Sequence, residues 1–198
     1  FNRFTPLPDS PLRTSLLELA ERDGQPLDDV LVADASRRTT AVNAYVSGFG
    51  STRRLVVHDT LLERASDDEV RLVVAHELGH TEHRDVQAGT LLGALAAAAG
   101  VCALFLLLRS DGLLGRAGAE GAGDPRVLAL VLALVTLGSA LTTPVQSAVS
   151  RQVERRADVH ALELTADPSA FVAMQRRLAV ANRSDLDPPR LLHAWFGT

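Results

Sequence analysis

The chain has 198 residues, a formal charge of −4 and a pI near 5.9, and its Arg residues are interspersed with Asp and Glu. A nucleic-acid partner is not expected, because phosphate binding requires a basic face. The one cysteine, Cys102, lies in an apolar run, which excludes a disulfide framework and disfavours a thiolate nucleophile. The length fits one domain, and Phe1 in place of Met suggests a segment of a longer protein.

The first third of the chain contains three short runs rich in β-branched and apolar residues. They predict strands at 29–34, 40–47 and 54–58. The Gly-containing stretch GFGST joins the second run to the third, as expected for a hairpin. This part therefore predicts a β-hairpin or small sheet.

A helix is predicted to begin at about Asp67. Ser66 is a suitable N-cap, and Glu69 follows it at the spacing of a capping box. Acidic residues in the first turn favour the positive end of the helix dipole. Apolar residues then recur at helical spacing, and no proline occurs before Val86, so the helix is expected to continue to that residue.

This helix carries the sequence HELGH, in which His76 and His80 are four residues apart and share one face. With Glu77 they form the HExxH pattern of zinc peptidases, in which the Glu takes a proton from metal-bound water without being a ligand. Ordinary surface histidines are the alternative. His83 lies about 10.5 Å of helix beyond His76, too far to share one ion. A metzincin would need a third His where Val86 stands.

Two long runs without a charged residue follow, at 88–108 and 127–150. Each can cross a hydrocarbon core of about 30 Å as a helix, and we expect spans at about 88–108 and 127–149. The Gly-rich stretch 109–126 is expected to be an exposed loop, so that the spans form a hairpin with both flanks on one side. Arg is more frequent in the flanks than in the loop, which favours a cytoplasmic catalytic side. Buried core helices of a soluble metalloprotease are the alternative.

A catalytic zinc needs a third protein ligand, and Glu154 in VERRAD is the best candidate. Asp158, four residues later, lies on the same helical face and can accept the free N–H of a zinc-bound histidine. We interpret His160 and Glu163 as solvated or packing residues. Two helices are predicted in this part, at 151–165 and 169–182.

Three parts are thus expected: 1–87 with the sheet and the HExxH helix, the apolar hairpin 88–150, and 151–198 with the Glu154 helix. The predicted fold is a mainly α-helical membrane protein with zincin catalytic helices. Folding of the hairpin returns Glu154 to the two histidines at the same bilayer face. The metal is therefore expected at the membrane boundary, where membrane lipid surrounds it and substrates are lipidated, membrane-inserted or presented at the surface.

At these residues the chain resembles the integral-membrane zinc metalloproteases of the CAAX prenyl protease 1 type, in the same superfamily as the bacterial heat-shock membrane protease. Besides HELGH and ERRAD, the stretches FNRFTPL, VADASRRTTAVNAYVSGFG and RRLVVHDTLL look like those of that family and occur in the same order. The resemblance implies a gluzincin-like site with one Zn²⁺ on His76, His80 and Glu154, with Glu77 as base. It also implies that Asp158 is catalytic, as a proton donor.

The same resemblance implies that NAYVSG is an edge strand on which the substrate lies extended, with Asn43 and Ala44 in contact with it. Prenylated peptides are the substrate class that it suggests. Members of the family carry several more spans upstream, which are not found in this sequence. The usual His-Pro after the last helix is also absent, and His193 is a poor substitute.

The resulting hypothesis is a multi-pass membrane zinc metalloendopeptidase acting on a peptide or protein, possible substrates being prenylated CAAX-type or other membrane-associated chains. A quality-control protease for damaged membrane proteins is one alternative. A catalytically idle peptide-binding scaffold is another, against which the intact Glu77 argues, because a structural zinc site needs no base.

Overall fold

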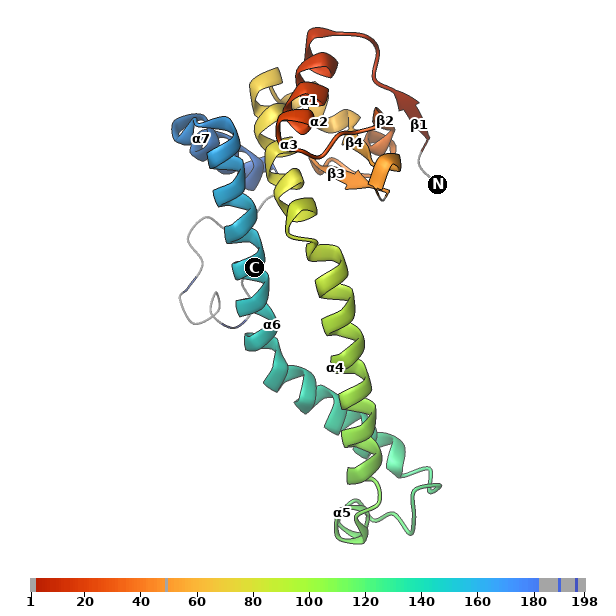
Figure 1. Ribbon diagram of the computed structural model, residues 1–198. Helices are drawn as coiled ribbons and strands as arrows, with labels where there is room; N and C mark the ends of the chain where they lie inside the picture. The colour runs from red at the N-terminus through yellow and green to blue at the C-terminus, as the bar shows by residue number, and fades with distance from the viewer. Residues whose placement is uncertain (1–2, 49, 182–188, 190–194, 196–198) are drawn as a thin grey trace. The chain divides into compact units, whose positions relative to one another are not determined.

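The structure is a computed structural model that describes residues 3–48, 50–181, 189 and 195. The chain divides into two compact units. The first, the packed unit, comprises 1–85 and 152–189, and the second, the apolar unit, comprises 86–151 and 190–198. The elements of both are labelled in Figure 1.

The packed unit combines a small sheet with helices from both ends of the chain. Its elements are β1 (Phe4–Pro6), α1 (Pro11–Arg22), β2 (Asp29–Ala33), η1 (Ala35–Arg37), β3 (Ala44–Ser47), η2 (Gly50–Thr52), β4 (Arg54–His58), α2 (Asp59–Arg64), α3 (Asp67–Glu82), the end of α6 (Val127–Thr165) and α7 (Pro168–Ala181).

The sheet has four strands in the order β1-β2-β4-β3. β2 runs parallel to β4, whereas β1 and β3 are antiparallel to their neighbours. The predicted hairpin of the second and third runs is confirmed as β3 and β4, although β3 begins only at Ala44. β1 and α1 were not predicted. Since β3 pairs only with β4 among the described strands, its outer side is an edge of the sheet.

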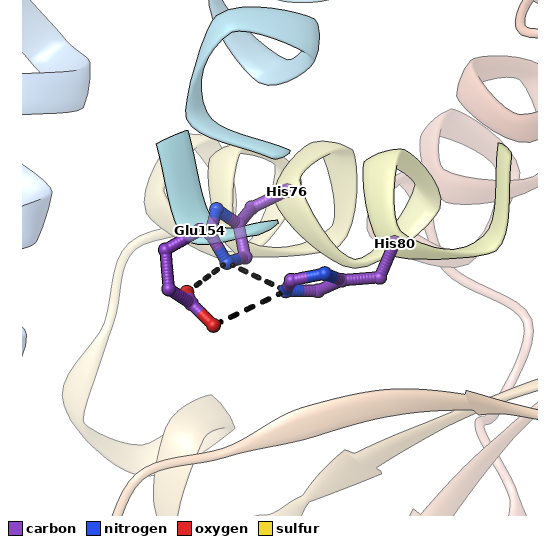
Figure 2. Close-up of side chains that lie close together, drawn as sticks. All are labelled: His76, His80 and Glu154. Carbon is purple, nitrogen blue, oxygen red and sulfur yellow. Dashed lines mark hydrogen bonds and ion pairs between the residues drawn. The ribbon is translucent and has the colours of Figure 1, made fainter. Parts of the chain in front are cut away.

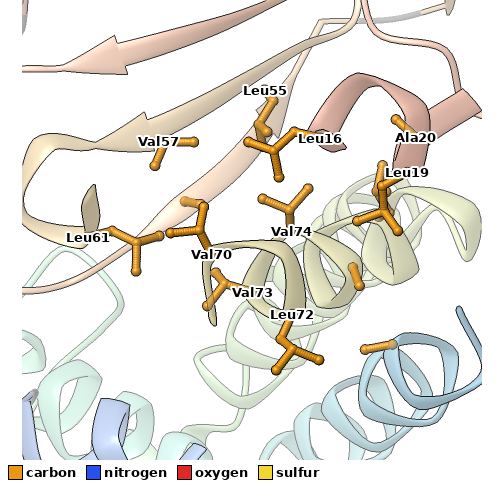
Figure 3. Packing of buried hydrophobic residues seen from close by; sticks show 14 of the residues in the cluster. Leu16, Leu19, Ala20, Leu55, Val57, Leu61, Val70, Leu72, Val73 and Val74 are labelled. Atoms are coloured by element: carbon orange, nitrogen blue, oxygen red, sulfur yellow. The ribbon is translucent and has the colours of Figure 1, made fainter. Parts of the chain in front are cut away.

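The core lies between the sheet and the helices α1 and α3 (Figure 3). The apolar positions of α3 recur at helical spacing and point into it, with Val70, Val74 and Leu78 fully buried. Leu16 of α1 and Leu55 of β4 are buried against them. One face of α3 is thereby fixed in the core, and its remaining face is left for polar side chains.

The end of α3 corrects the expectation of an uninterrupted helix to Val86. α3 ends at Glu82, and the N–H of His83 still bonds to Gly79 O at 3.1 Å. Arg84 then adopts φ 54°, the left-handed conformation that commonly follows a helix C-cap, and α4 begins at Asp85. Glycine usually occupies this position, so an arginine there gives no stop signal in the sequence.

The apolar unit contains α4 (Asp85–Leu107) without its first residue, Asp85, which belongs to the packed unit. It also contains the short α5 (Asp111–Arg116) and the first part of α6. None of the residues of α4 is buried. α4 and α6 are long and apolar enough to cross a membrane by length and composition. α5 lies in the stretch that was expected to be an exposed loop, with Leu114 packed in a small cluster with Val127.

The helix predicted at 151–165 is not separate, because α6 continues from Val127 to Thr165. The change from apolar to charged sequence at Arg151 suggests a boundary, but this stretch contains no residue that breaks a helix. Pro144, the only proline in α6, removes one backbone donor and does not end it. α7 occurs at Pro168–Ala181, close to the predicted 169–182.

Candidate metal centre

α3 presents its two candidate ligands because of how its start is fixed. Ser66 and Glu69 form the predicted capping box, in which the Glu69 side chain accepts from Ser66 N at 2.9 Å. With the Val70 face in the core, His76 and His80 lie on a partly buried face of the same helix.

The ring nitrogens of the two histidines point toward each other and toward a carboxylate of α6 (Figure 2). His76 Nε2 and His80 Nε2 are 3.2 Å apart. Glu154 Oε2 lies 3.4 Å from His76 Nε2, and Glu154 Oε1 lies 3.9 Å from His80 Nε2. Among the described residues, these three form the group of His, Cys, Asp or Glu able to hold a metal.

The donor set fits a zinc ion. Zinc binds imidazole nitrogen and carboxylate oxygen at about 2.0–2.2 Å in a tetrahedron, which separates neighbouring donors by about 3.4 Å. The distances between the donors of His76, His80 and Glu154 are close to this value. Three protein ligands leave the fourth position open, as in catalytic rather than structural zinc sites.

Glu154 comes near the histidines because α3 and α6 approach closely at Gly79. A Cβ at Gly79 would lie 2.9 Å from Ala157 Cα and 3.1 Å from His160 Cβ. Ala157 is itself small and fully buried. The Gly of HELGH therefore has a packing role, which its place between the two histidines indicates.

Each candidate histidine also faces a second carboxylate with its other ring nitrogen. His76 Nδ1 lies 2.9 Å from Asp158 Oδ1, in keeping with the orienting role predicted for this aspartate. His80 Nδ1 lies 2.9 Å from Asp85 Oδ2. Asp85 was missed, because a helix continued to Val86 would not bring this side chain back to His80.

Burial and neighbouring charges shift three pKa values in this group, and the hydrogen bond with His76 lowers the pKa of Glu154. Burial lowers the pKa of His76, but the neighbouring carboxylates Asp158 and Glu154 outweigh it and raise that pKa to about 9. Burial raises the pKa of Glu77, and the two histidines only partly oppose this rise. A carboxyl group with a raised pKa is a better proton acceptor than an exposed one, which suits a general base.

The other polar residues considered as metal ligands are not part of the group formed by His76, His80 and Glu154. His83 Nδ1 bonds to Gly79 O at 2.8 Å, and His160 Nε2 lies 2.9 Å from Asp23 Oδ1. His83, His160 and Glu163 line a separate polar cavity. His193 lies outside the described residues.

Asn43 and Ala44 lie at the start of the edge strand β3. Asn43 O accepts from His58 N of β4 at 3.0 Å. Because successive residues of a strand direct their backbone groups to opposite sides, those of Ala44 face the outer edge. β3 packs against α3.

The chain matches the model of peptidase family M48 over residues 6–198. The chain belongs to this family. It is 36% identical over its whole length to "Uncharacterized metalloprotease YhfN" of Bacillus subtilis, of which it covers 47%. It is 45% identical over 43% of its length to CAAX prenyl protease 1 of Saccharomyces cerevisiae, of which it covers 19%.

Its fold is similar to the crystal structure of S. mikatae Ste24p, with a TM-score of 0.82 and 27% identity over 98% of this chain and 49% of the other. The predicted fold class, mainly helical with a small sheet and two long apolar helices, is thereby confirmed. The chain spans about half the length of the YhfN and Ste24p chains that it matches.

Proposed function

We propose that this chain forms the catalytic part of a membrane zinc metalloendopeptidase. The observation that supports this most is the convergence of His76, His80 and Glu154 at distances suited to one ion, beside an intact Glu77. Membership of a peptidase family with metalloprotease-named relatives points the same way.

His76, His80 and Glu154 would hold the metal. A zinc ion held there would supply a lowered pKa for bound water and polarisation of the scissile carbonyl. Glu77 accepts a proton from the attacking water and delivers it to the leaving amine. Asp158 would hold the ring of His76 at Nδ1, and the role of proton donor rests on the family resemblance alone.

The substrate is proposed to lie extended along the outer edge of β3, where Ala44 offers its backbone C=O. The Ala44 N–H, which donates to Asn43 Oδ1 at 3.0 Å, would turn to the substrate. Asn43, one residue earlier, supports the start of this strand through its bond to β4. An Ala44→Pro variant, which lacks the N–H, is expected to raise KM more than it lowers kcat.

We further propose that α4 and the first part of α6 span the membrane in contact with lipid, as parts of a multi-pass protein. A helix that is apolar around its whole circumference and also unburied has no partner in the described chain, which favours a lipid environment. The excess of Arg in the flanks supports a cytoplasmic catalytic side. Retention of the protein in membranes after carbonate washing tests the spans, and release without detergent would contradict them.

The test of the enzymatic function is Glu77→Gln in the full-length zinc-loaded protein. We expect cleavage to fall by about 10²–10⁴-fold, because the base is lost, while bound zinc is unchanged. Glu82→Gln, an exposed Glu on the same helix, is the matched control. Equal cleavage by the Glu77→Gln variant would show that the measured proteolysis does not come from this site, and would leave a peptide-binding scaffold as the alternative function.

A prenylated peptide is the substrate class suggested by the relatives named CAAX prenyl protease 1. Comparison of a farnesylated peptide with its unlipidated version tests it, and we expect the farnesylated one to be cleaved with the higher kcat/KM. The chain is also 30% identical over 87% of its length to a "Protease HtpX homolog" of Kineococcus radiotolerans. Cleavage of membrane proteins without a prenyl group, and no preference for the farnesylated peptide, would instead favour a quality-control function.

A further inference from the structure

Asp85 binds two partners, one with each carboxylate oxygen. Oδ2 lies 2.9 Å from His80 Nδ1, and Oδ1 lies 2.9 Å from the NH2 of Arg156. The side chain of Asp85 is only 7% exposed, whereas that of Arg156 is 42% exposed, so the contact with His80 is the better shielded of the two. A carboxylate accepts a hydrogen bond more strongly than a neutral oxygen does.

The turn at Arg84 brings this carboxylate to His80. In a continuous helix a residue five positions later lies about 140° round the axis and about 7.5 Å along it, away from the earlier side chain. Here the left-handed Arg84 ends α3 and redirects the chain, and Asp85 returns to His80.

We propose that Asp85 is a positioning residue for the metal ligand His80. By accepting the Nδ1–H it selects the tautomer whose Nε2 lone pair faces His76 and Glu154, and it fixes the orientation of the ring. This inference rests on the proposed function, because it requires His80 to bind the metal.

Arg156 extends the same role to α6. It lies two residues after Glu154, so the contacts from His80 through Asp85 to Arg156 join the end of α3 to the segment that carries the third ligand. The contact between Asp85 and Arg156 therefore helps to fix the distance between the end of α3, which carries His80, and the part of α6 that carries Glu154. Loss of Arg156 is expected to weaken metal binding less than loss of Asp85, because His80 keeps its acceptor.

The chain contains a matched control for this arrangement. Asp23 lies 2.9 Å from a ring nitrogen of His160, and its side chain is 8% exposed. His160 is outside the ligand group. Replacement of Asp23 thus removes a similarly buried carboxylate, at the same 2.9 Å distance, from a histidine outside the ligand group.

The experiment measures zinc Kd by chelator competition, and thermal unfolding of the metal-free form, on full-length protein in detergent. We expect Asp85→Ala to raise the zinc Kd by about 10–100-fold. Asp85→Asn is expected to raise it about tenfold, because the amide oxygen still accepts the Nδ1–H but lacks the charge. Asp23→Asn is expected to lower the unfolding temperature of the metal-free protein and to leave Kd within twofold.

Two results would overturn the inference. One is a zinc Kd for Asp85→Asn and Asp85→Ala within twofold of wild type. The other is an equal rise in Kd for Asp23→Asn, which would make the effect one of general stability. If Asp85→Ala does not fold, the near-isosteric Asp85→Asn decides alone. Wild-type protein that binds no zinc would instead overturn the proposed function, and this inference with it.

Discussion

α3 and α4 are consecutive helices separated by His83 and Arg84, and their apolar residues have opposite environments. α3 has one apolar face, and its residues Val70, Val74 and Leu78 are fully buried in the core. From Val86 on, α4 is apolar on all sides, and none of its residues is buried. All of the candidate ligands lie on α3 and on the charged end of α6, and none lies on α4.

The difference shows what a metal site requires of a helix. Donor atoms must stay within a few tenths of an ångström of their positions, and a helix with one face fixed in a close-packed core provides this. A helix that is apolar all round has no preferred face and suits a lipid environment. Stability of the site is therefore expected to depend on α3, and insertion into a membrane on α4.

The same charge introduced into each helix gives the largest expected effect. Val74→Asp places an unpaired carboxylate in the core and is expected to destabilise the packed unit by more than about 4 kcal/mol, with loss of zinc binding. Leu95→Asp, at the middle of α4, is expected to weaken membrane insertion by about 3 kcal/mol while the detergent-solubilised protein still binds zinc. Thermal unfolding, zinc binding and carbonate extraction measure these effects. Loss of zinc binding in both variants would remove the distinction.

A smaller effect is expected from pH, and it arises in the packed unit. The raised pKa of His76 means that protonation favours the folded metal-free protein. This stabilisation, at most about 3 kcal/mol, is fully present below pH 6.5 and is lost as the pH rises through about 9. Metal binding needs the unprotonated ring, so the zinc Kd is expected to fall about tenfold for each pH unit up to about 9.

Unfolding of the metal-free protein between pH 6 and 9, with a chelator present, measures the first effect, and zinc titration at each pH measures the second. His76→Gln is the control for the metal-free measurement, because it removes the titrating group and should flatten the stability profile. A wild-type profile as flat as that of His76→Gln would contradict the assignment.

A feature of this molecule could be predicted from the sequence only where residues close together in the chain indicate it. The ligand pair is four residues apart on one helix, and the capping box at Ser66 marks the start of that helix, so both could be predicted. The convergence of Glu154 could be proposed only through its likeness to a known pattern, because 73 residues separate it from His80. The Arg84 turn left no signal, since arginine rarely adopts φ > 0, and Asp85 was missed with it.

A methyl group added to a glycine of each helix gives a finer comparison. Gly79→Ala puts a Cβ 2.9 Å from the Ala157 backbone, so α6 must move, and we expect about 1–3 kcal/mol of destabilisation together with weaker zinc binding. Gly93→Ala on α4 meets nothing within 4 Å and is expected to change stability by less than about 1 kcal/mol. Thermal unfolding and zinc Kd measure both. Equal zinc affinities in the two variants would mean that the approach of α3 and α6 does not set the ligand geometry.

The smallest effect is expected at Arg84, where the two helices separate. An L-residue with a side chain in the left-handed conformation costs about 1 kcal/mol, which glycine avoids. Arg84→Gly is therefore expected to stabilise the metal-free protein by up to about 1 kcal/mol and to leave zinc affinity unchanged. Arg84→Ala removes the same side chain without relieving the backbone, so it isolates any contribution of the charge. If Arg84→Gly is no more stable than Arg84→Ala, Arg84 does not adopt the left-handed conformation in solution. α3 and α4 would then not be separated at this residue.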